Sequence, residues 1–374
     1  MKSPIRFLAK LILSLLFLAV AAVPAVAAAP YMACKYYCLM DAASGQVILS
    51  QNADKLRPVA STTKMMTAIL TVDYSGLSEK ATVSENADHT PEFTIGLRAG
   101  QKVPVSELLN VSVIRSSNDA AVVLAEHVAG DEELFAHLMS LKAFAIGAMN
   151  THFKNASGLP AGDHYSTAYD LGQIGRYALS YPQIRERVGT KRGKFAHPGY
   201  GQPLDISNTN GLLGSYPGAD GIKTGTADAA GKCLVASATR GGRQLIAVAL
   251  KSGDRTGDCA RLLDYGFNNS VLTKIIDHGS AFKHITVING EKSGVDIYPQ
   301  NDLYLWTGEK TPNIEKRVKM VYQLQAPVSK GKIIGIVQLY ADGKLVKSTN
   351  LICGEEIRPK PNLIYRAIKD FLFS

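Results

Sequence analysis

The chain has 374 residues and 46% hydrophobic content, which is ample for a core and indicates about two domains. Its formal net charge is +9, but three basic residues lie in the first 29 residues, leaving 38 Lys and Arg against 32 Asp and Glu, or +6. This charge favours anionic surfaces such as lipid headgroups or cell-wall polymer. No nucleic-acid motif accompanies it, so no nucleic-acid partner is expected.

The first segment, residues 1–29, is predicted to be a secretory signal peptide. Basic residues at Lys2, Arg6 and Lys10 precede an apolar stretch, and Ala27-Ala28-Ala29 is a cleavage site of the Ala-x-Ala type. The alternative is an uncleaved anchor helix, against which Pro24 and the small residues argue. The mature protein is therefore expected outside the cytoplasmic membrane.

A catalytic domain of mixed α/β class is predicted for residues 30–275. The pattern begins with a strand hairpin over 36–49, continues through a helical middle, and returns to strands over 222–226, 233–239 and 245–250, followed by a helix over 258–265. Strands at both ends of a helical segment predict that the two ends meet in one sheet, with helices packed on it.

The residues after the catalytic domain are predicted to form a small all-β domain followed by a short tail. Strands are expected over 285–288, 302–306, 318–324, 333–340 and 344–351, which gives a domain of residues 280–358. In the tail, 362–374, apolar residues share one helical face, as in an interfacial membrane helix. The alternative for the tail is a helix that packs on its own protein.

Five cysteines, an odd number in an exported chain, are Cys34, Cys38, Cys233, Cys259 and Cys353. Their spacing matches no zinc motif. The sequence allows either a Cys34–Cys38 disulfide or buried free thiols. Cys233 is expected to be a buried thiol, because it lies in the apolar pattern of its strand. No metal or cofactor is expected.

Three short motifs carry the chemistry: Ser61-Thr62-Thr63-Lys64, Ser116-Ser117-Asn118 and Lys223-Thr224-Gly225. Ser-x-x-Lys also occurs at Ser280 and Ser329, but only Ser61 opens a run of helical periodicity. At positions i and i+3 of one helix, the Lys64 amine can reach the Ser61 hydroxyl. The order of the three motifs is that of active-serine enzymes that react with penicillin.

In this interpretation Lys64 is the base that activates Ser61, and burial together with Lys223 favours its neutral form. Ser116 would relay a proton, and Asn118 would bind the substrate backbone. Lys223 and Thr224 would supply a cation and a hydroxyl, and the Thr226 and Ser61 N–H groups would hold an oxyanion. The alternatives are a helix cap for Ser116 and Asn118 and a solvated strand lysine for Lys223.

Over nearly its whole length, the sequence resembles the low-molecular-mass penicillin-binding proteins, D-alanyl-D-alanine carboxypeptidases that include penicillin-binding proteins 5 and 6. Beyond the three motifs, the resemblance rests on several further segments of this sequence. They are Ser117-Asn118-Asp119-Ala120, Thr151-His152-Phe153, Asn208-Thr209-Asn210-Gly211, Asp220-Gly221-Ile222, Ala326-Pro327-Val328 and Asp342-Gly343-Lys344.

The resemblance implies a β-lactamase/transpeptidase-like fold and a Ser61 acyl-enzyme that releases the terminal D-alanine of peptidoglycan stem peptides, thereby limiting cross-linking. It also implies β-lactams as covalent inhibitors and attachment to the outer face of the cytoplasmic membrane through the tail. Arg255 is similar to an arginine that meets the terminal carboxylate, although a surface role is open. Ser117 and Ala227 depart from glycine and threonine, which are frequent there in the family.

Two other functions compete with this one. A class A β-lactamase needs a glutamate between the second and third motifs, and no Glu-x-x-Leu-Asn string lies there. A non-catalytic β-lactam-binding or wall-binding protein would be expected to have lost residues such as Ser61, Lys64 or Lys223, which are intact.

Overall fold

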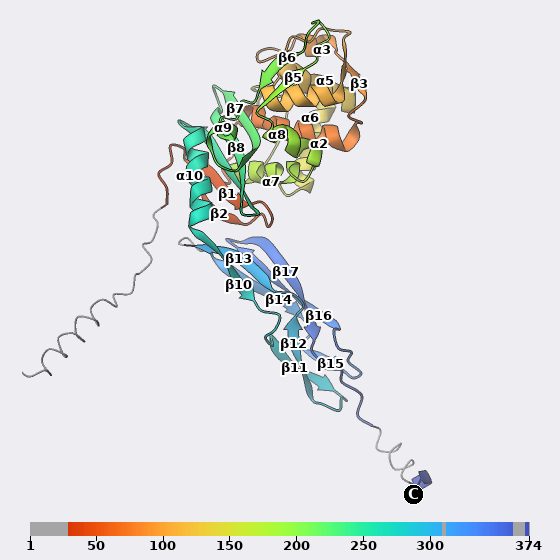
Figure 1. Ribbon diagram of the computed structural model, residues 1–374. Helices are drawn as coiled ribbons and strands as arrows, with labels where there is room; N and C mark the ends of the chain where they lie inside the picture. The colour runs from red at the N-terminus through yellow and green to blue at the C-terminus, as the bar shows by residue number, and fades with distance from the viewer. Residues whose placement is uncertain (1–28, 309–311, 362–370, 374) are drawn as a thin grey trace, which may run out of the picture.

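The computed structural model describes residues 29–308, 312–361 and 371–373. These residues form an α/β domain and, after it in the chain, an all-β domain. Figure 1 shows the all-β domain extending away from one end of the α/β domain. The predicted mixed fold class is confirmed.

The α/β domain is built on one antiparallel sheet of five strands. Its strand order is β2-β1-β9-β8-β7, so the first hairpin of the domain lies beside strands more than 190 residues later. β1 pairs with β9 in the register Cys38 to Val248, as the prediction of a single sheet requires. The bounds are β1 (Tyr36–Asp41), β2 (Val47–Gln51), β7 (Ala219–Ala227), β8 (Gly231–Arg240) and β9 (Arg243–Ser252).

Both faces of this sheet are buried, which explains the unbroken apolar run of β9. Ile246, Val248 and Leu250 join the core under the helical middle, whereas Leu245 and Ala247 join the core under the last helix of the domain. Successive side chains of a strand point to opposite faces, so an apolar residue is needed at every position.

Helices cover the two faces unequally: α10 lies on one side of the strands and α2 and α7 lie on the other, as Figure 1 shows. The helical elements are η1 (Ala60–Thr63), α2 (Lys64–Tyr74), α3 (Glu85–Asp88), α4 (Val105–Asn110), the π-helical turn η2 (Val111–Arg115), α5 (Asn118–Ala129), α6 (Glu132–Ala145), α7 (Ala168–Ala178), α8 (Pro182–Gly189), α9 (Leu212–Ser215) and α10 (Arg255–Asn268). Two small antiparallel sheets of two strands each complete the domain, β3 (Lys80–Thr82) with β4 (Lys102–Pro104), and β5 (Arg192–Phe195) with β6 (Leu204–Ser207).

The β domain consists of a six-stranded sheet, β14-β16-β17-β12-β11-β15, and a two-stranded sheet, β10-β13. Its strands are β10 (Ser270–Ile276), β11 (Lys283–Ile288), β12 (Gly294–Pro299), β13 (Leu303–Gly308), β14 (Ile314–Met320), β15 (Gln323–Gln325), β16 (Ile333–Ala341) and β17 (Lys344–Cys353). The predicted hairpin turn over 341–343 joins β16 to β17.

The single strand predicted over 318–324 is wrong. β14 pairs antiparallel with β16, whereas β15 pairs parallel with β11, so the chain changes partner at Val321 and Tyr322. The prediction also missed β10 and β12. Four consecutive residues of β10 are exposed, so it lacks the apolar alternation by which a strand is recognised.

All five cysteines are buried free thiols, so the Cys34–Cys38 disulfide does not form in this structure. Burial is the main reason that the pKa of each thiol is raised, which makes them unreactive.

The signal peptide predicted for 1–29 lies outside the described residues except for Ala29, and so does the predicted tail except for 371–373. In the part of the chain that the structure describes, no helix has the length and apolar character needed to cross a membrane.

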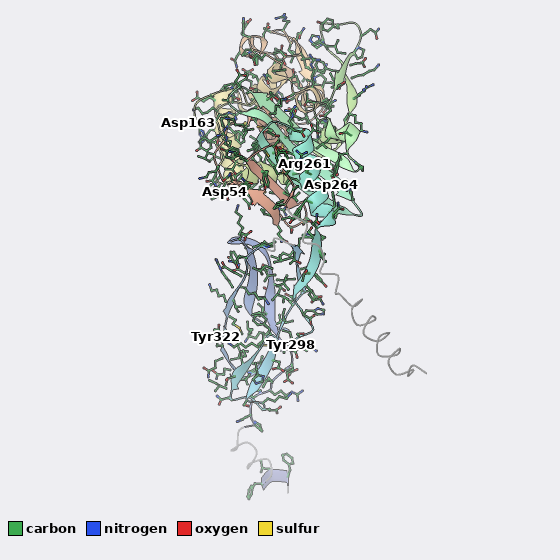
Figure 2. The ribbon with its side chains drawn as sticks, turned by 90° about the vertical axis from the view of Figure 1, so that its left-hand side faces the viewer. Asp54, Asp163, Arg261, Asp264, Tyr298 and Tyr322 are labelled. Carbon is green, nitrogen blue, oxygen red and sulfur yellow. The ribbon has the colours of Figure 1, made fainter. Side chains whose placement is uncertain are left out.

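Specific contacts hold the two domains together. The Gln46 side chain makes two hydrogen bonds with the Trp306 backbone, donating from Nε2 to the carbonyl (2.6 Å) and accepting from the N–H (2.7 Å). Lys344 of the β domain bonds Asp54 at 3.0 Å, and Figure 2 shows Asp54 on the edge of the α/β domain that faces the β domain. The Lys344–Asp54 pair is exposed and contributes little stability, so the buried Gln46 bonds fix the contact.

Candidate active site

Ser61 lies in the 3₁₀ turn η1, which runs directly into α2 at Lys64. The helical offset of three residues brings the Lys64 Nζ to 3.0 Å from the Ser61 Oγ. The Lys64 amine thus reaches the Ser61 hydroxyl, as the spacing of the two residues predicts. Ser280 and Ser329, the other serines of this spacing, lie in turns of the β domain without such a helix.

The Lys64 amine is fully buried and donates to two carbonyl oxygens, Asn118 Oδ1 at 2.6 Å and Ser157 O at 2.7 Å. Neither oxygen carries a proton that it could give back. A neutral amine has two N–H groups and one lone pair, so these two bonds leave the lone pair facing the Ser61 hydroxyl. The Asn118 amide is held in this orientation because its Nδ2 donates to the Glu92 carbonyl at 3.1 Å.

Burial, and then the charge of Lys223, lowers the pKa of Lys64 well below the ordinary lysine value. Asp119 and Glu132 act in the opposite direction but are the smaller influences. Desolvation disfavours the ammonium form because a charge loses its hydration in the interior. The neutral, proton-accepting form of Lys64 is therefore accessible.

The second motif joins the π-helical turn η2 to α5. Ser116 adopts a left-handed backbone conformation, with φ of 74°, and Asn118 begins α5. Asp119 then accepts the backbone N–H groups of Ile95, Gly96 and Leu97 at 3.1–3.2 Å, together with the Ser117 hydroxyl. Asp119 thus anchors the loop that carries the Glu92 carbonyl beside Asn118.

The third motif lies on β7, which pairs with β8 on one side and forms the edge of the sheet. Lys223 is buried, and the Thr224 hydroxyl bonds the Thr209 hydroxyl at 2.5 Å. Position 225 has to be glycine because the strand lies so close to the serine turn. A Cβ there would lie 2.7 Å from the Val59 carbonyl oxygen and 3.1 Å from the Thr62 nitrogen. The strand and the serine turn are therefore in direct backbone contact.

The structure brings Arg255 to this strand. Its Nη1 donates to the Gly225 carbonyl and the Thr226 hydroxyl, both at 2.8 Å. Burial, and then the charge of Arg255, lowers the pKa of Lys223 to about 7. Within the described residues, neither Lys223 nor Arg255 forms an ion pair with a carboxylate, so the two cations make this end of β7 electropositive.

A loop under the serine turn was missed by the sequence reasoning. The loop supplies the Ser157 carbonyl, and Gly158, with φ of +84°, packs so closely that a Cβ would lie 2.0 Å from the Ala60 carbonyl oxygen. The His164 Nε2 lies 2.8 Å from the Thr63 Oγ1, and Thr63 in turn donates to the Ala60 carbonyl. The only sequence signal was a run of Ser, Gly, Pro and Asp residues, which indicates a loop but not its partner.

His164 stays neutral over a wide pH range. Burial, and then the nearby His152, lowers its pKa to about 4. The Lys154 N–H approaches the His164 Nδ1 at 3.3 Å, so Nδ1 accepts and the proton sits on Nε2, facing Thr63. The histidine therefore holds the serine turn as a neutral hydrogen-bond donor.

The structure thus brings the helix-borne Ser-x-x-Lys pair, the Asn118 amide and the edge strand β7 together in one site, in the motif order expected from the sequence. A family profile described as D-alanyl-D-alanine carboxypeptidase matches residues 23–253, and one described as penicillin-binding protein 5, C-terminal domain, matches residues 272–359. The chain belongs to the D-alanyl-D-alanine carboxypeptidase family.

Similar proteins cover almost the whole chain. D-alanyl-D-alanine carboxypeptidase DacA of Escherichia coli K12 is 32% identical over 358 residues, which is 91% of this chain and 87% of that protein. DacF of Bacillus subtilis is 30% identical over 330 residues, 86% and 85% of the two chains. The crystal structure of penicillin-binding protein 5 from Haemophilus influenzae has a TM-score of 0.70 and 29% identity, and the match covers 88% of this chain and 98% of that one.

Replacing Gly225 by alanine is expected to reduce peptidase activity by roughly 100-fold, the effect of a misplacement of about 1 Å at a reacting centre. The added methyl group must push β7 away from the Val59 carbonyl and the serine turn. Steady-state kinetics measures the loss. Gly214→Ala is the matched control, because a Cβ there meets no atom within 4 Å; equal activity of the two variants would contradict the close-approach argument.

His164 should make the protein less stable in acid. Between pH 6.5 and 4 the unfolded chain binds a proton that the folded His164 does not, so the free energy of unfolding falls as pH falls, by up to roughly 3 kcal/mol. Urea unfolding at pH 7 and pH 4.5 measures this loss. The variant His164→Gln, which cannot titrate, should lose less stability than the native protein over the same interval, and identical losses would refute the assignment.

Proposed function

We propose that the protein is a serine-type D-Ala-D-Ala carboxypeptidase that removes the terminal D-alanine from peptidoglycan stem peptides through a Ser61 acyl-enzyme. The observation that carries the proposal is the hydrogen-bond set of Lys64, whose two N–H groups are occupied by Asn118 and Ser157 while the Ser61 hydroxyl lies at 3.0 Å. Such a lysine can accept the serine proton as the new bond forms.

In the acylation step, the Ser61 Oγ attacks the carbonyl carbon of the penultimate D-alanine and its proton passes to Lys64. The N–H groups of Ser61 and Thr226 hold the developing oxyanion. The peptide bond then breaks, and a proton relayed through Ser116 reaches the amine of the departing D-alanine. A β-lactam acylates the same Ser61, and its ring nitrogen receives the proton.

Substrate binding uses the edge of the sheet and the cations next to it. An extended peptide can add to the free edge of β7, with the Asn118 amide and the Thr224 hydroxyl on its flanks. Its terminal carboxylate is met by Lys223, Thr226 and Arg255, of which Arg255 already contacts the Thr226 hydroxyl. Gly225 lets this strand lie against the serine turn.

After the terminal D-alanine has left, water hydrolyses the bond between Ser61 and the remaining peptide, which completes the reaction.

The setting of the reaction is also proposed. The basic, apolar N-terminal segment supports export, and the amphipathic sequence of 362–374 supports peripheral attachment to the outer face of the cytoplasmic membrane. Residues 30–275 would carry the chemistry and 280–358 would form the domain between it and the tail. Removal of terminal D-alanine limits the donor peptides available for cross-linking.

The direct test is release of D-alanine from a peptide ending in D-Ala-D-Ala, with Ser61→Ala and Lys64→Ala beside the native protein. Native protein should release D-alanine, whereas both variants should lose the activity by roughly 1000-fold or more, because the nucleophile and its base act as a unit. Full activity in Ser61→Ala refutes the proposal. Hydrolysis of penicillin without release of D-alanine would indicate a β-lactamase, and binding without either reaction a non-catalytic protein.

The activity toward carboxylate-bearing peptides should fall as pH rises through the titration of Lys223. This lysine has a pKa of about 7 in the folded protein, so above that pH it loses the ammonium charge that attracts the substrate carboxylate. The pH profile of kcat/KM reports groups of the free enzyme. The variant Lys223→Arg remains charged, so its profile should lack this decline; a decline at the same pH in both proteins would assign it to another group.

A further inference from the structure

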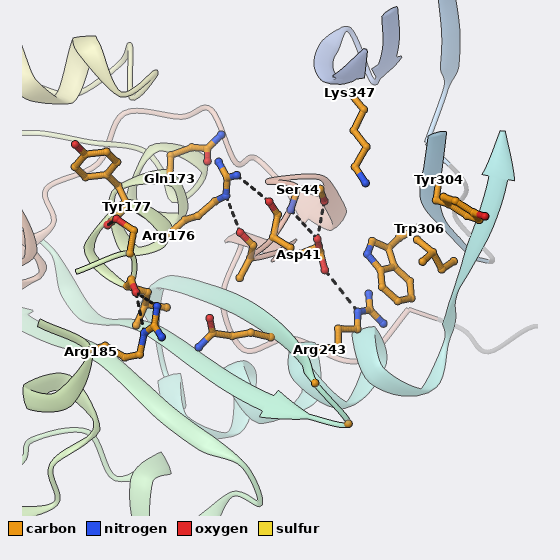
Figure 3. Close-up of a pocket in the computed structure, with 18 of the residues that line it drawn as sticks. Asp41, Ser44, Gln173, Arg176, Tyr177, Arg185, Arg243, Tyr304, Trp306 and Lys347 are labelled. Carbon is orange, nitrogen blue, oxygen red and sulfur yellow. Dashed lines mark hydrogen bonds and ion pairs between the residues drawn. The ribbon is translucent and has the colours of Figure 1, made fainter. Parts of the chain in front are cut away.

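A cavity lies between the two domains, far from Ser61. Its volume is about 800 Å³, and it is lined by the end of the central sheet, the end of α7 and residues of β13 and β17 (Figure 3). In β8, Cys233 lies opposite Gly225 near the active site, whereas Arg240 pairs with Arg243 at the cavity end. Arg240 follows Cys233 by seven residues, which corresponds to about 23 Å along the strand, so the two sites are separate.

The cavity carries an excess of positive charge. Four basic side chains, Arg176, Arg185, Arg243 and Lys347, line it together with one acid, Asp41. Asp41 is already engaged, since it accepts from the Ser44 N–H and hydroxyl and lies 3.7 Å from the Arg243 Nε. In the part of the chain that the structure describes, none of the other three basic side chains has a carboxylate partner.

Two of these arginines are held in place without being neutralised. Arg176 donates to the carbonyls of Ala42 and Ala43 at 2.7 and 3.0 Å, and Arg185 donates twice to the carbonyl of Leu179 at 2.9 and 2.6 Å. A carbonyl orients a guanidinium but leaves its full charge, and each arginine has five N–H donors. Both groups are thus preorganised to bind an oxyanion with their remaining donors.

The β domain completes the cavity with Trp306 and Lys347. The Arg243 guanidinium lies 3.2 Å from the centroid of the Trp306 ring, and Gln46 fixes the Trp306 backbone from the other domain. Lys347 is exposed and points from its strand toward the space between Ser44 and Trp306, as Figure 3 shows. A ligand that neutralises Arg176 or Arg185 together with Lys347 must therefore touch both domains.

We propose that this interdomain cavity binds a small ligand with at least two oxyanion groups, carboxylate or phosphate, which bridge the arginines of the α/β domain and Lys347 of the β domain. The site would be independent of the chemistry at Ser61. Because the ligand contacts both domains, its binding favours the arrangement in which they are held together.

Tryptophan fluorescence tests the proposal directly, because Trp306 is the single tryptophan of the chain. The mature protein is titrated with pyrophosphate in one arm and citrate in the other, at constant ionic strength. We expect a saturable change in Trp306 emission with at least one probe, and the arm that saturates identifies phosphate or carboxylate as the preferred group. No saturable change with either probe overturns the proposal.

Two variants and a control assign the binding to the cavity. Lys347→Glu and Arg185→Gln should each weaken binding by roughly fivefold, the size expected from loss or reversal of an exposed ion contact. The control Lys319→Glu changes charge equally on an exposed residue of β14 that does not line the cavity. Equal weakening in Lys347→Glu and Lys319→Glu would show a general charge effect and refute the site. D-alanine release should be the same in Lys347→Glu and native protein.

Discussion

The proposed active site depends on one buried amine. Lys64 is held by two carbonyl oxygens that come from different parts of the chain, Asn118 at the start of α5 and Ser157 in the loop below the serine turn. Burying an amine is costly when it is charged, and here the cost favours the neutral form of Lys64 that the proposed reaction needs. Moving either oxygen would leave an N–H unpaired or turn the lone pair away from Ser61. The surrounding elements therefore have to be positioned accurately.

The scaffold meets this requirement by close backbone packing. Gly225 lets the edge strand β7 touch the serine turn from one side, and Gly158 lets the loop touch it from the other. Asp119 fixes the segment that orients Asn118, and His164 fixes Thr63 beside Ser61. Because the central sheet is buried on both faces, β7 cannot shift without disturbing two cores. The packing of the sheet therefore helps to fix the position of the serine turn that carries Ser61.

Sequence reasoning succeeded where the relation between residues is local. The three-residue offset of Ser61 and Lys64, the β16–β17 turn and the burial of Cys233 all follow from the period of one element. Sequence reasoning failed where contacts between distant parts of the chain determine the structure. Ser157 and His164 were missed because their partners lie about 100 residues away in the sequence. The strands β14 and β15 were predicted as one because the sequence does not show that they pair with different strands. The role of Arg255 could not be decided from the sequence, because only the fold shows that its guanidinium reaches Gly225 and Thr226.

The most direct test of this account is the protonation state of Lys64 itself. NMR titration of the protein labelled at the lysine side chains, with the Lys64 signal assigned by its absence in Lys64→Arg, gives the pKa of that amine. We predict that Lys64 titrates well below the exposed lysines, because burial and then Lys223 disfavour its charge. Titration of Lys64 together with the exposed lysines, near the ordinary value of about 10.4, would contradict the account.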